Sequence, residues 1–164
     1  MAALSNIVHN GPGNPPELAE FFERFNNEAL AVDKWFMLQA TVPASNENVN
    51  TLQTVRELLK HPSFTLKNPN RARSLVAAFE MQNPSVFHSH SGDGYALWAD
   101  LVIELNTINP QVAARMARGL DRWTKLVPAL QEKAHKQLER VLDTDKLSPD
   151  VREVIGKALD AATH

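Results

Sequence analysis

Hydrophobic residues recur along this chain at intervals of three and four, the spacing that places them on one face of an α-helix. Few stretches alternate apolar and polar residues, and glycine-rich hairpin signals are missing. The pattern predicts a helical turn near residues 2–8 and helices near residues 15–29, 30–42, 48–60, 69–82, 93–107, 109–118, 121–126, 128–143 and 149–162. The chain is therefore predicted to be all-α.

Residues that cap helices stand directly before a proline at several places in the chain. They are Asn14, Asn68, Asn83, Asn109 and Ser148. The side chain of Asn or Ser can accept a hydrogen bond from a free N–H at a helix start, and proline in the first helical position has no N–H to leave unpaired. Most of these pairs precede an apolar helical pattern, so we predict that helices begin there.

The width of each apolar face indicates how the helices stack. The segments 30–42 and 93–107 are apolar on most sides, which places them in the middle of the fold, whereas 128–143 has one apolar stripe and is predicted to be an outer helix. Short connections favour antiparallel pairs. We predict a right-handed superhelical α-solenoid of about nine or ten helices, degenerate HEAT- or armadillo-like, in a single domain over residues 1–164. A closed helical bundle is the alternative.

Composition narrows the class of protein further. The 164 residues suffice for one domain, and the absence of cysteine excludes disulfides, thiol nucleophiles and thiolate zinc sites. Lys and Arg number 17 against 19 for Asp and Glu, and this balance argues against nonspecific binding of nucleic acid. The sequence shows no signal peptide and no membrane-spanning run, so we expect a soluble, cytoplasmic protein without a membrane partner.

Candidate metal ligands are few. No H-E-x-x-H motif occurs. His88, His90 and Asp93 could offer three ligands in one loop, but we interpret them as a polar turn that leads into the next helix. This loop, residues 87–94, and the loop 43–47 are the segments predicted to be most mobile. No metal site is predicted in the chain.

Catalytic patterns are equally weak. No serine lies in a G-x-S-x-G elbow. Asp100 and Glu104 lie four residues apart on one helical face and could serve as general acid and base of a small hydrolase. Because the other faces of this helix are apolar, a hydrated edge is the better interpretation. No catalytic residue is predicted.

One polar face is more informative. Gln111, Arg115 and Arg118 share the side of their helix opposite its packed side, and Arg73 lies opposite the apolar side of its own helix. Guanidinium groups displayed in this way can bind carboxylates through two hydrogen bonds. The alternative is an ordinary solvated face paired with nearby acids.

Several ordered blocks of the chain closely resemble the C-terminal helical domain of bacterial aminopeptidase N. They are Asp33–Ala40, His61–Phe64, Asn68–Leu75, Asn83-Pro84 with Phe87-His88, Gly92–Tyr95 and Asn106–Arg115. The similarity covers essentially the whole chain and weakens after about residue 118.

The resemblance implies the rest of the function. Family members are cytoplasmic zinc aminopeptidases that release N-terminal residues from peptides, and their zinc ligands, amine-binding segment and catalytic tyrosine lie in a catalytic domain that this chain lacks. The terminal domain is an α-solenoid that closes over the active site, leaving a chamber reached by narrow openings that admit small peptides. Carried over by position, the resemblance implies that Arg73, Gln111 and Arg115 face this chamber and bind substrate.

The fragment is thus expected to hold no cofactor and to lack activity alone, with zinc bound in the catalytic domain of the parent enzyme. Its expected partners are the remaining domains of that enzyme and small peptides. A stand-alone HEAT-like adaptor that binds a partner protein in its concave groove is the alternative. The reading frame upstream of Met1 separates the two, because the first interpretation requires a zinc-peptidase sequence there.

Overall fold

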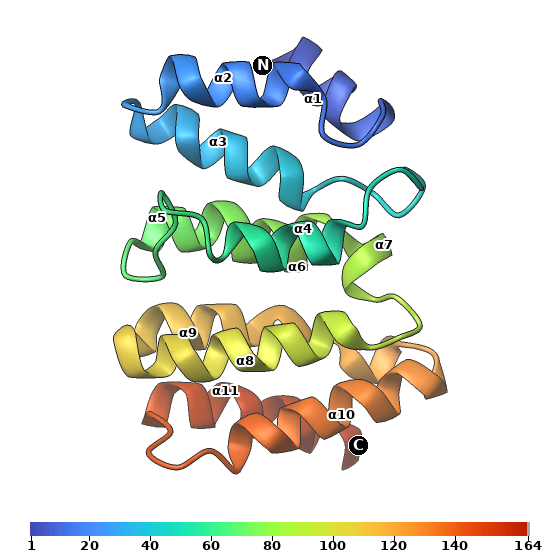
Figure 1. Cartoon of the computed structure of the whole chain (residues 1–164). Coiled ribbons are helices and arrows are strands. Elements are labelled where there is room, and N and C mark those ends of the chain that lie inside the picture. The colour runs from blue at the N-terminus through green and yellow to red at the C-terminus, as the bar shows by residue number, and fades with distance from the viewer. Residues whose placement is uncertain (164) are drawn as a thin grey trace. The chain divides into compact units, whose positions relative to one another are not determined.

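The computed structural model describes residues 1–163, and every regular element within this range is helical (Figure 1). The helices are α1 (Ala2–Asn10), α2 (Pro16–Phe25), α3 (Ala29–Ala40), α4 (Thr51–Leu58), α5 (Pro69–Ala72), η1 (Arg73–Ala77), α6 (Ala78–Gln82), α7 (Pro84–Phe87), α8 (Asp93–Ile108), α9 (Pro110–Ala117), η2 (Arg118–Leu120), η3 (Trp123–Lys125), α10 (Pro128–Leu142), α11 (Pro149–Asp160) and η4 (Ala161–Thr163). The all-α prediction is confirmed.

The chain divides into two compact units, Met1–Val86 and a second unit that begins at Phe87. The expectation of a single domain over residues 1–164 stays a prediction.

Three of the predicted caps form as expected. The side-chain oxygen of Asn68 accepts hydrogen bonds from the N–H groups of Asn70 and Arg71 at the start of α5. Asn109 accepts from the N–H of Val112 in α9, and Ser148 accepts from the first turn of α11. These side chains satisfy N–H groups that the helix itself cannot pair.

The other two capping predictions are wrong. Asn14 has a φ of 56°, in the left-handed region, and Pro15 rather than Asn14 directly precedes α2. Asn83 does precede a short helix, α7, but its amide nitrogen donates to the carbonyl oxygens of Ala40 and Val42 at 3.0 and 2.7 Å. Asn83 therefore ties two distant parts of the first unit together instead of capping its own helix.

In the first unit, α3 is the central element. It contacts α1, α2, α4, η1 and α6, which agrees with the wide apolar face of segment 30–42. Phe36 is fully buried, and the indole of Trp35 donates a hydrogen bond to the carbonyl oxygen of Leu18 at 2.9 Å. Leu30 is an exception, because 75% of it is exposed at the start of the helix.

A partly buried ion pair joins α3 to α5. The Arg71 Nε donates to the Asp33 carboxylate at 2.6 Å, and another guanidinium nitrogen of Arg71 donates to the Ser63 carbonyl oxygen at 2.5 Å. The guanidinium also lies over the Phe36 ring. Burial and the charge of Arg71 lower the pKa of His61, whose Nδ1 accepts a hydrogen bond from the Ser63 N–H.

In the second unit, α8 packs against α9 and α10, and α11 packs against α9 and α10 (Figure 1). The indole of Trp98, buried on α8, donates to the carbonyl oxygen of Met116 at 3.0 Å. Asn106 accepts a hydrogen bond from the Ser148 N–H at 2.9 Å, which fixes the turn before α11. As predicted, α10 buries a single stripe, which consists of Leu130, Ala134, Leu138 and Val141.

The structure departs from the predicted elements at three places. The helix predicted over 69–82 contains a π-helical turn, η1, in which the Ala78 N–H bonds to the Arg73 carbonyl oxygen five residues earlier. The segment predicted as a helix over 121–126 contains one short 3₁₀ helix, η3, and it ends before α10 because Val127 precedes a proline and adopts an extended conformation. The short helix α7 lacks an apolar period of its own.

Candidate functional site

Gln111 and Arg115 lie one turn apart on the exposed side of α9. Ala113 and Met116 occupy the opposite, buried side of this helix. Gln111 and Arg115 are exposed, and neither side chain makes a hydrogen bond or ion pair with any other residue in the described range 1–163. Their polar groups are therefore available to a ligand.

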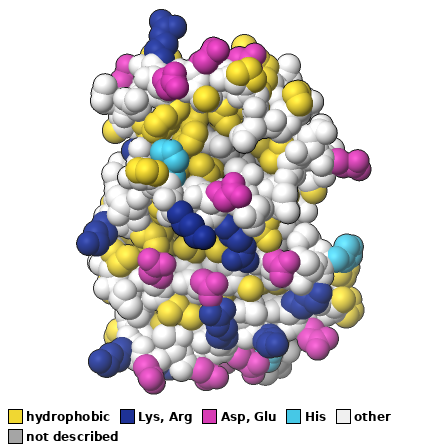
Figure 2. All heavy atoms as spheres, viewed as in Figure 1, with side chains coloured by type: hydrophobic (Ala, Val, Ile, Leu, Met, Phe, Trp, Pro, Cys, Tyr) yellow, Lys and Arg dark blue, Asp and Glu magenta, His cyan; other side chains and the backbone are white. Residues whose placement is uncertain are grey.

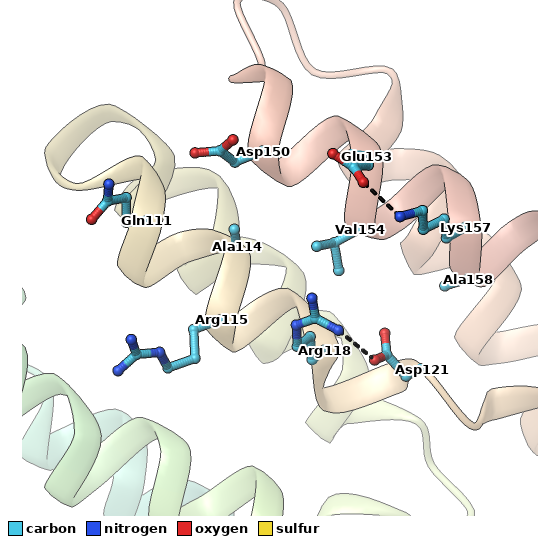
Figure 3. A pocket seen from close by; sticks show the side chains of 10 residues that line it. All are labelled: Gln111, Ala114, Arg115, Arg118, Asp121, Asp150, Glu153, Val154, Lys157 and Ala158. Atoms are coloured by element: carbon cyan, nitrogen blue, oxygen red, sulfur yellow. Dashed lines mark hydrogen bonds and ion pairs between the residues drawn. The ribbon is translucent and has the colours of Figure 1, made fainter.

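Both residues line a pocket of about 530 Å³ between α9, η2 and α11 (Figure 3). The remaining lining residues are Ala114, Arg118, Asp121, Asp150, Glu153, Val154, Lys157 and Ala158. The volume is sufficient for a small ligand.

The arginines of this pocket differ in their surroundings. In Figure 3 the guanidinium of Arg115 points away from α11, whereas Arg118 extends toward the space between the two helices. Arg118 lies 3.5 Å from the Asp121 carboxylate, so its charge is partly compensated. The sequence grouped these side chains on one face, and the structure separates the unpaired Arg115 from the paired Arg118.

The α11 wall of the pocket carries two carboxylates and one ammonium group. Asp150 and Glu153 lie on it, and Lys157 donates a hydrogen bond to Glu153 at 2.5 Å. The pKa of the Glu153 carboxyl lies below its usual value because of this hydrogen bond and the positive charges of Lys157 and Arg118. The pocket thus presents cationic groups from α9 and η2 opposite carboxylates from α11.

Arg73 lies in the first unit, where it is the first residue of the π-helical turn η1. Its side chain is exposed and makes no hydrogen bond or ion pair within residues 1–163, while the neighbouring Leu75 and Phe79 are buried. The structure therefore brings Gln111 and Arg115 together at one pocket, and Arg73 is not among the residues that line it.

The other candidates have local roles. His88 Nδ1 lies 2.7 Å from the Tyr95 hydroxyl, and burial lowers the pKa of His88. Asp100 forms an ion pair with Arg140 at the surface. Among the described residues, no three His, Cys, Asp or Glu side chains are placed to hold a metal ion.

Two features of these cavities have no signal in the sequence. Asp150 and Glu153 belong to the pocket of Arg115, and only the packing of α11 against α9 reveals this. In the first unit, a cavity of about 910 Å³ lies beside Trp35 and His61 and includes the loop at Asn14. No local pattern marks this cavity, because its walls come from separate segments.

Comparison with known proteins defines the family. The family model described as "Domain of unknown function (DUF3458_C) ARM repeats" matches residues 1–160, so this chain belongs to that family of ARM-repeat domains. The predicted solenoid of helix pairs, armadillo-like in kind, is therefore confirmed.

Its relatives are aminopeptidases. The chain is 44% identical to aminopeptidase N of Escherichia coli (strain K12) over 160 residues, which is 97% of this chain and 18% of that protein. It is 39% identical to aminopeptidase N of Caulobacter vibrioides over 153 residues, or 93% of this chain and 17% of that protein. The structure of Legionella pneumophila aminopeptidase A in complex with aspartic acid matches 97% of this chain and 18% of its own, with 31% identity and a TM-score of 0.86. This chain thus spans less than a fifth of each of these proteins.

No helix in the described part of the chain is both long and apolar enough to span a membrane.

Proposed function

We propose that this chain, over residues 1–164, is the C-terminal domain of a cytoplasmic, zinc-dependent aminopeptidase N. In that enzyme it covers the active-site chamber, limits access to small peptides and helps to orient the substrate tail. The zinc ion and the catalytic residues belong to the remaining part of the enzyme, and this chain alone is inactive. The observation that carries the proposal is the similarity to aminopeptidases N over nearly the whole chain.

Arg73, Gln111 and Arg115 are the residues proposed to face the chamber. All three are exposed, and within residues 1–163 none of their side chains is engaged by a hydrogen bond or an ion pair. A peptide held by its amino end at the zinc site carries its carboxylate on the far side, and an arginine can bind this group through two hydrogen bonds. In a chamber with little water such a contact is stronger than on an open surface.

The test is Arg115→Ala in the complete enzyme, assayed with tripeptides and with amino-acid anilides, which lack the peptide tail. Loss of an Arg–carboxylate contact of about 1–3 kcal/mol should lower kcat/KM for tripeptides roughly ten- to hundredfold. The value for anilides should change less than about twofold, because they do not reach Arg115.

The matched control is Arg152→Ala, which removes an exposed arginine of α11 that does not line the Arg115 pocket. It should leave kcat/KM for both substrates near the wild-type value. Equal losses of kcat/KM for tripeptides and anilides in Arg115→Ala would contradict the orienting role. The wider assignment to an aminopeptidase is tested separately, by whether the complete protein cleaves peptides at all.

A further inference from the structure

The second unit contains another cavity, of about 400 Å³, beside the turn between α9 and α10. Its walls come from His88 and from most of the turn 118–126, and we refer to it as the turn cavity. Neither Gln111 nor Arg115 lines it, so it is separate from the substrate-orienting role proposed above.

The turn cavity carries a net positive charge. Arg118, Arg122 and Lys125 line it with a single carboxylate, Asp121, so the formal charge is three minus one, or +2. Asp121 pairs with Arg118 at 3.5 Å, and both side chains are well exposed, so this is a weak surface pair. The side chains of Arg122 and Lys125 form no hydrogen bond or ion pair among residues 1–163.

The turn that carries these cations is held in place from two sides. The side-chain amide of Gln131 donates hydrogen bonds to the carbonyl oxygens of Thr124 and Leu126, both at 2.8 Å. The buried indole of Trp123 donates to the carbonyl oxygen of Ala158 at 2.8 Å. A turn fixed in this way loses little conformational entropy when a ligand binds to its side chains.

His88 adds a neutral hydrogen-bond donor to the cavity. The Tyr95 hydroxyl is fully buried, and within the described chain its hydrogen-bond partner is His88 Nδ1 at 2.7 Å. A buried hydroxyl that failed to donate would cost free energy, so the hydroxyl donates to Nδ1 and the ring proton resides on Nε2. Burial raises the pKa of Tyr95 to about 12 and lowers that of His88, so the hydroxyl keeps its proton and the ring is neutral at pH 7.

We infer that the turn cavity is a binding site for a phosphate dianion, either free inorganic phosphate or the phosphoryl group of a small phosphomonoester. A phosphate dianion compensates the formal charge of +2, offers acceptor oxygens to guanidinium, ammonium and imidazole donors, and fits a cavity of this size. A carboxylate would compensate only half of that charge.

The experiment is a titration of the ¹⁵N-labelled 164-residue chain with inorganic phosphate at pH 7.5, followed by two-dimensional NMR at constant ionic strength set with chloride. Saturable shifts should appear at the amides of residues 118–126 and at the His88 ring. The double variant Arg122→Gln/Lys125→Gln should weaken the affinity at least tenfold. Both side chains are exposed, and the NMR spectrum shows whether the double variant folds. If it does not fold, the single variant Lys125→Gln replaces it, and its affinity for phosphate should fall at least threefold.

The matched control is the double variant Lys136→Gln/Arg152→Gln, which removes the same charge from exposed positions of the same unit outside the turn cavity. It should bind phosphate with wild-type affinity. Two outcomes would overturn the inference: equal losses of phosphate affinity in both double variants, or shifts that do not saturate and that spread over all basic side chains. Either would show that phosphate only screens the positive charges in general.

Two further ligands define the chemical class. The affinity for glycerol 3-phosphate is compared with that for inorganic phosphate. Whichever of the two binds more tightly is the better model of the natural ligand, a phosphomonoester or free phosphate. Saturable binding of either one supports the site. Acetate tests for a carboxylate site. If acetate binds the turn cavity as tightly as both phosphates do, the assignment to a phosphate dianion is wrong. Arg115→Ala should not change any of these affinities, so the outcome is independent of the role proposed for Arg115.

Discussion

Glu80 is an ionisable residue in an environment that disfavours its charge. The residue is only 5% exposed, and neither carboxyl oxygen has a hydrogen-bond partner in the described part of the chain. Burial raises the pKa of this carboxyl well above its usual value near 4.5. The folded protein therefore holds Glu80 protonated over a pH range in which the unfolded chain would ionise it.

This difference makes stability depend on pH. Above about pH 4.5 the unfolded state binds fewer protons at this position than the folded state, so the free energy of unfolding falls as pH rises, by up to about 1.4 kcal/mol per pH unit, until the folded carboxyl also ionises. Glu80→Gln removes the titration and keeps the size of the side chain. We expect the free energy of unfolding of Glu80→Gln to rise relative to wild type between pH 5 and pH 8, as measured by urea denaturation.

The control is Glu132→Gln, which changes an exposed glutamate of α10. Its free energy of unfolding should stay close to the wild-type value throughout this range. A pH-independent difference between Glu80→Gln and wild type would show that Glu80 is charged or absent from the core in the folded protein.

At the scale of elements, the start of α9 determines whether Gln111 and Arg115 are presented correctly. Asn109→Ala removes the side-chain acceptor that pairs with the Val112 N–H. We expect a loss of about 1 kcal/mol in the free energy of unfolding, measured by urea denaturation, because an alanine at this position cannot pair that N–H.

Asn70→Ala is the matched change for this test, because Asn70 is an exposed residue whose side chain makes no hydrogen bond within residues 1–163. It should cost much less than Asn109→Ala. Equal losses in the two variants would mean that the Asn109 cap contributes nothing to stability.

Local signals account for which elements the sequence could predict. The Asn-Pro and Ser-Pro pairs and the apolar periods fixed the starts of α5, α9 and α11, because capping depends on residues within one turn. The role of Asn83 could not be predicted, since its partners Ala40 and Val42 lie more than forty residues away in the chain. The 3₁₀ helix η3 depends in part on Gln131, which belongs to the next helix.

In the candidate site too, local features could be predicted from the sequence and long-range contacts could not. The exposure of Gln111 and Arg115 follows from helical spacing, and the resemblance singled them out from other solvated residues. The carboxylates of α11 that complete their pocket could not be predicted, because helix packing brings them there. Arg118 differs from Arg115 in having an ion-pair partner, Asp121, and this pair forms only in the folded turn.

At the scale of the whole molecule, charge is balanced and dispersed. The chain has a formal net charge of −2. On the face shown in Figure 2, basic and acidic side chains lie among one another over α8 to α11, and hydrophobic side chains reach the surface over α3. Large exposed hydrophobic residues include Leu30 at 75%, and Met81 and Val127 at 55% each. Single exposed residues of this kind are common on protein surfaces.

From the function proposed above, we expect the isolated chain to have no peptidase activity and to associate with the remainder of the proposed enzyme when the two are mixed. The mixture should recover hydrolysis of anilides and tripeptides, measured by product release, with association followed by size-exclusion chromatography. A mixture containing Arg115→Ala should associate equally well and recover anilide hydrolysis but little tripeptide hydrolysis. Failure of the wild-type chain to associate would contradict tight packing between the two parts.

The extra residue in the π-helical turn η1 determines which of the residues after it face the core. A turn closed by a bond from Ala78 to Arg73 contains one residue more than an α-helical turn. Removing a single residue from Arg73–Ala77 would leave an uninterrupted α-helix whose later residues are rotated by about 100° around the axis. Phe79 and Glu80 would then leave the interior without any change in their identity, so their burial is encoded by a local insertion as much as by their own chemistry.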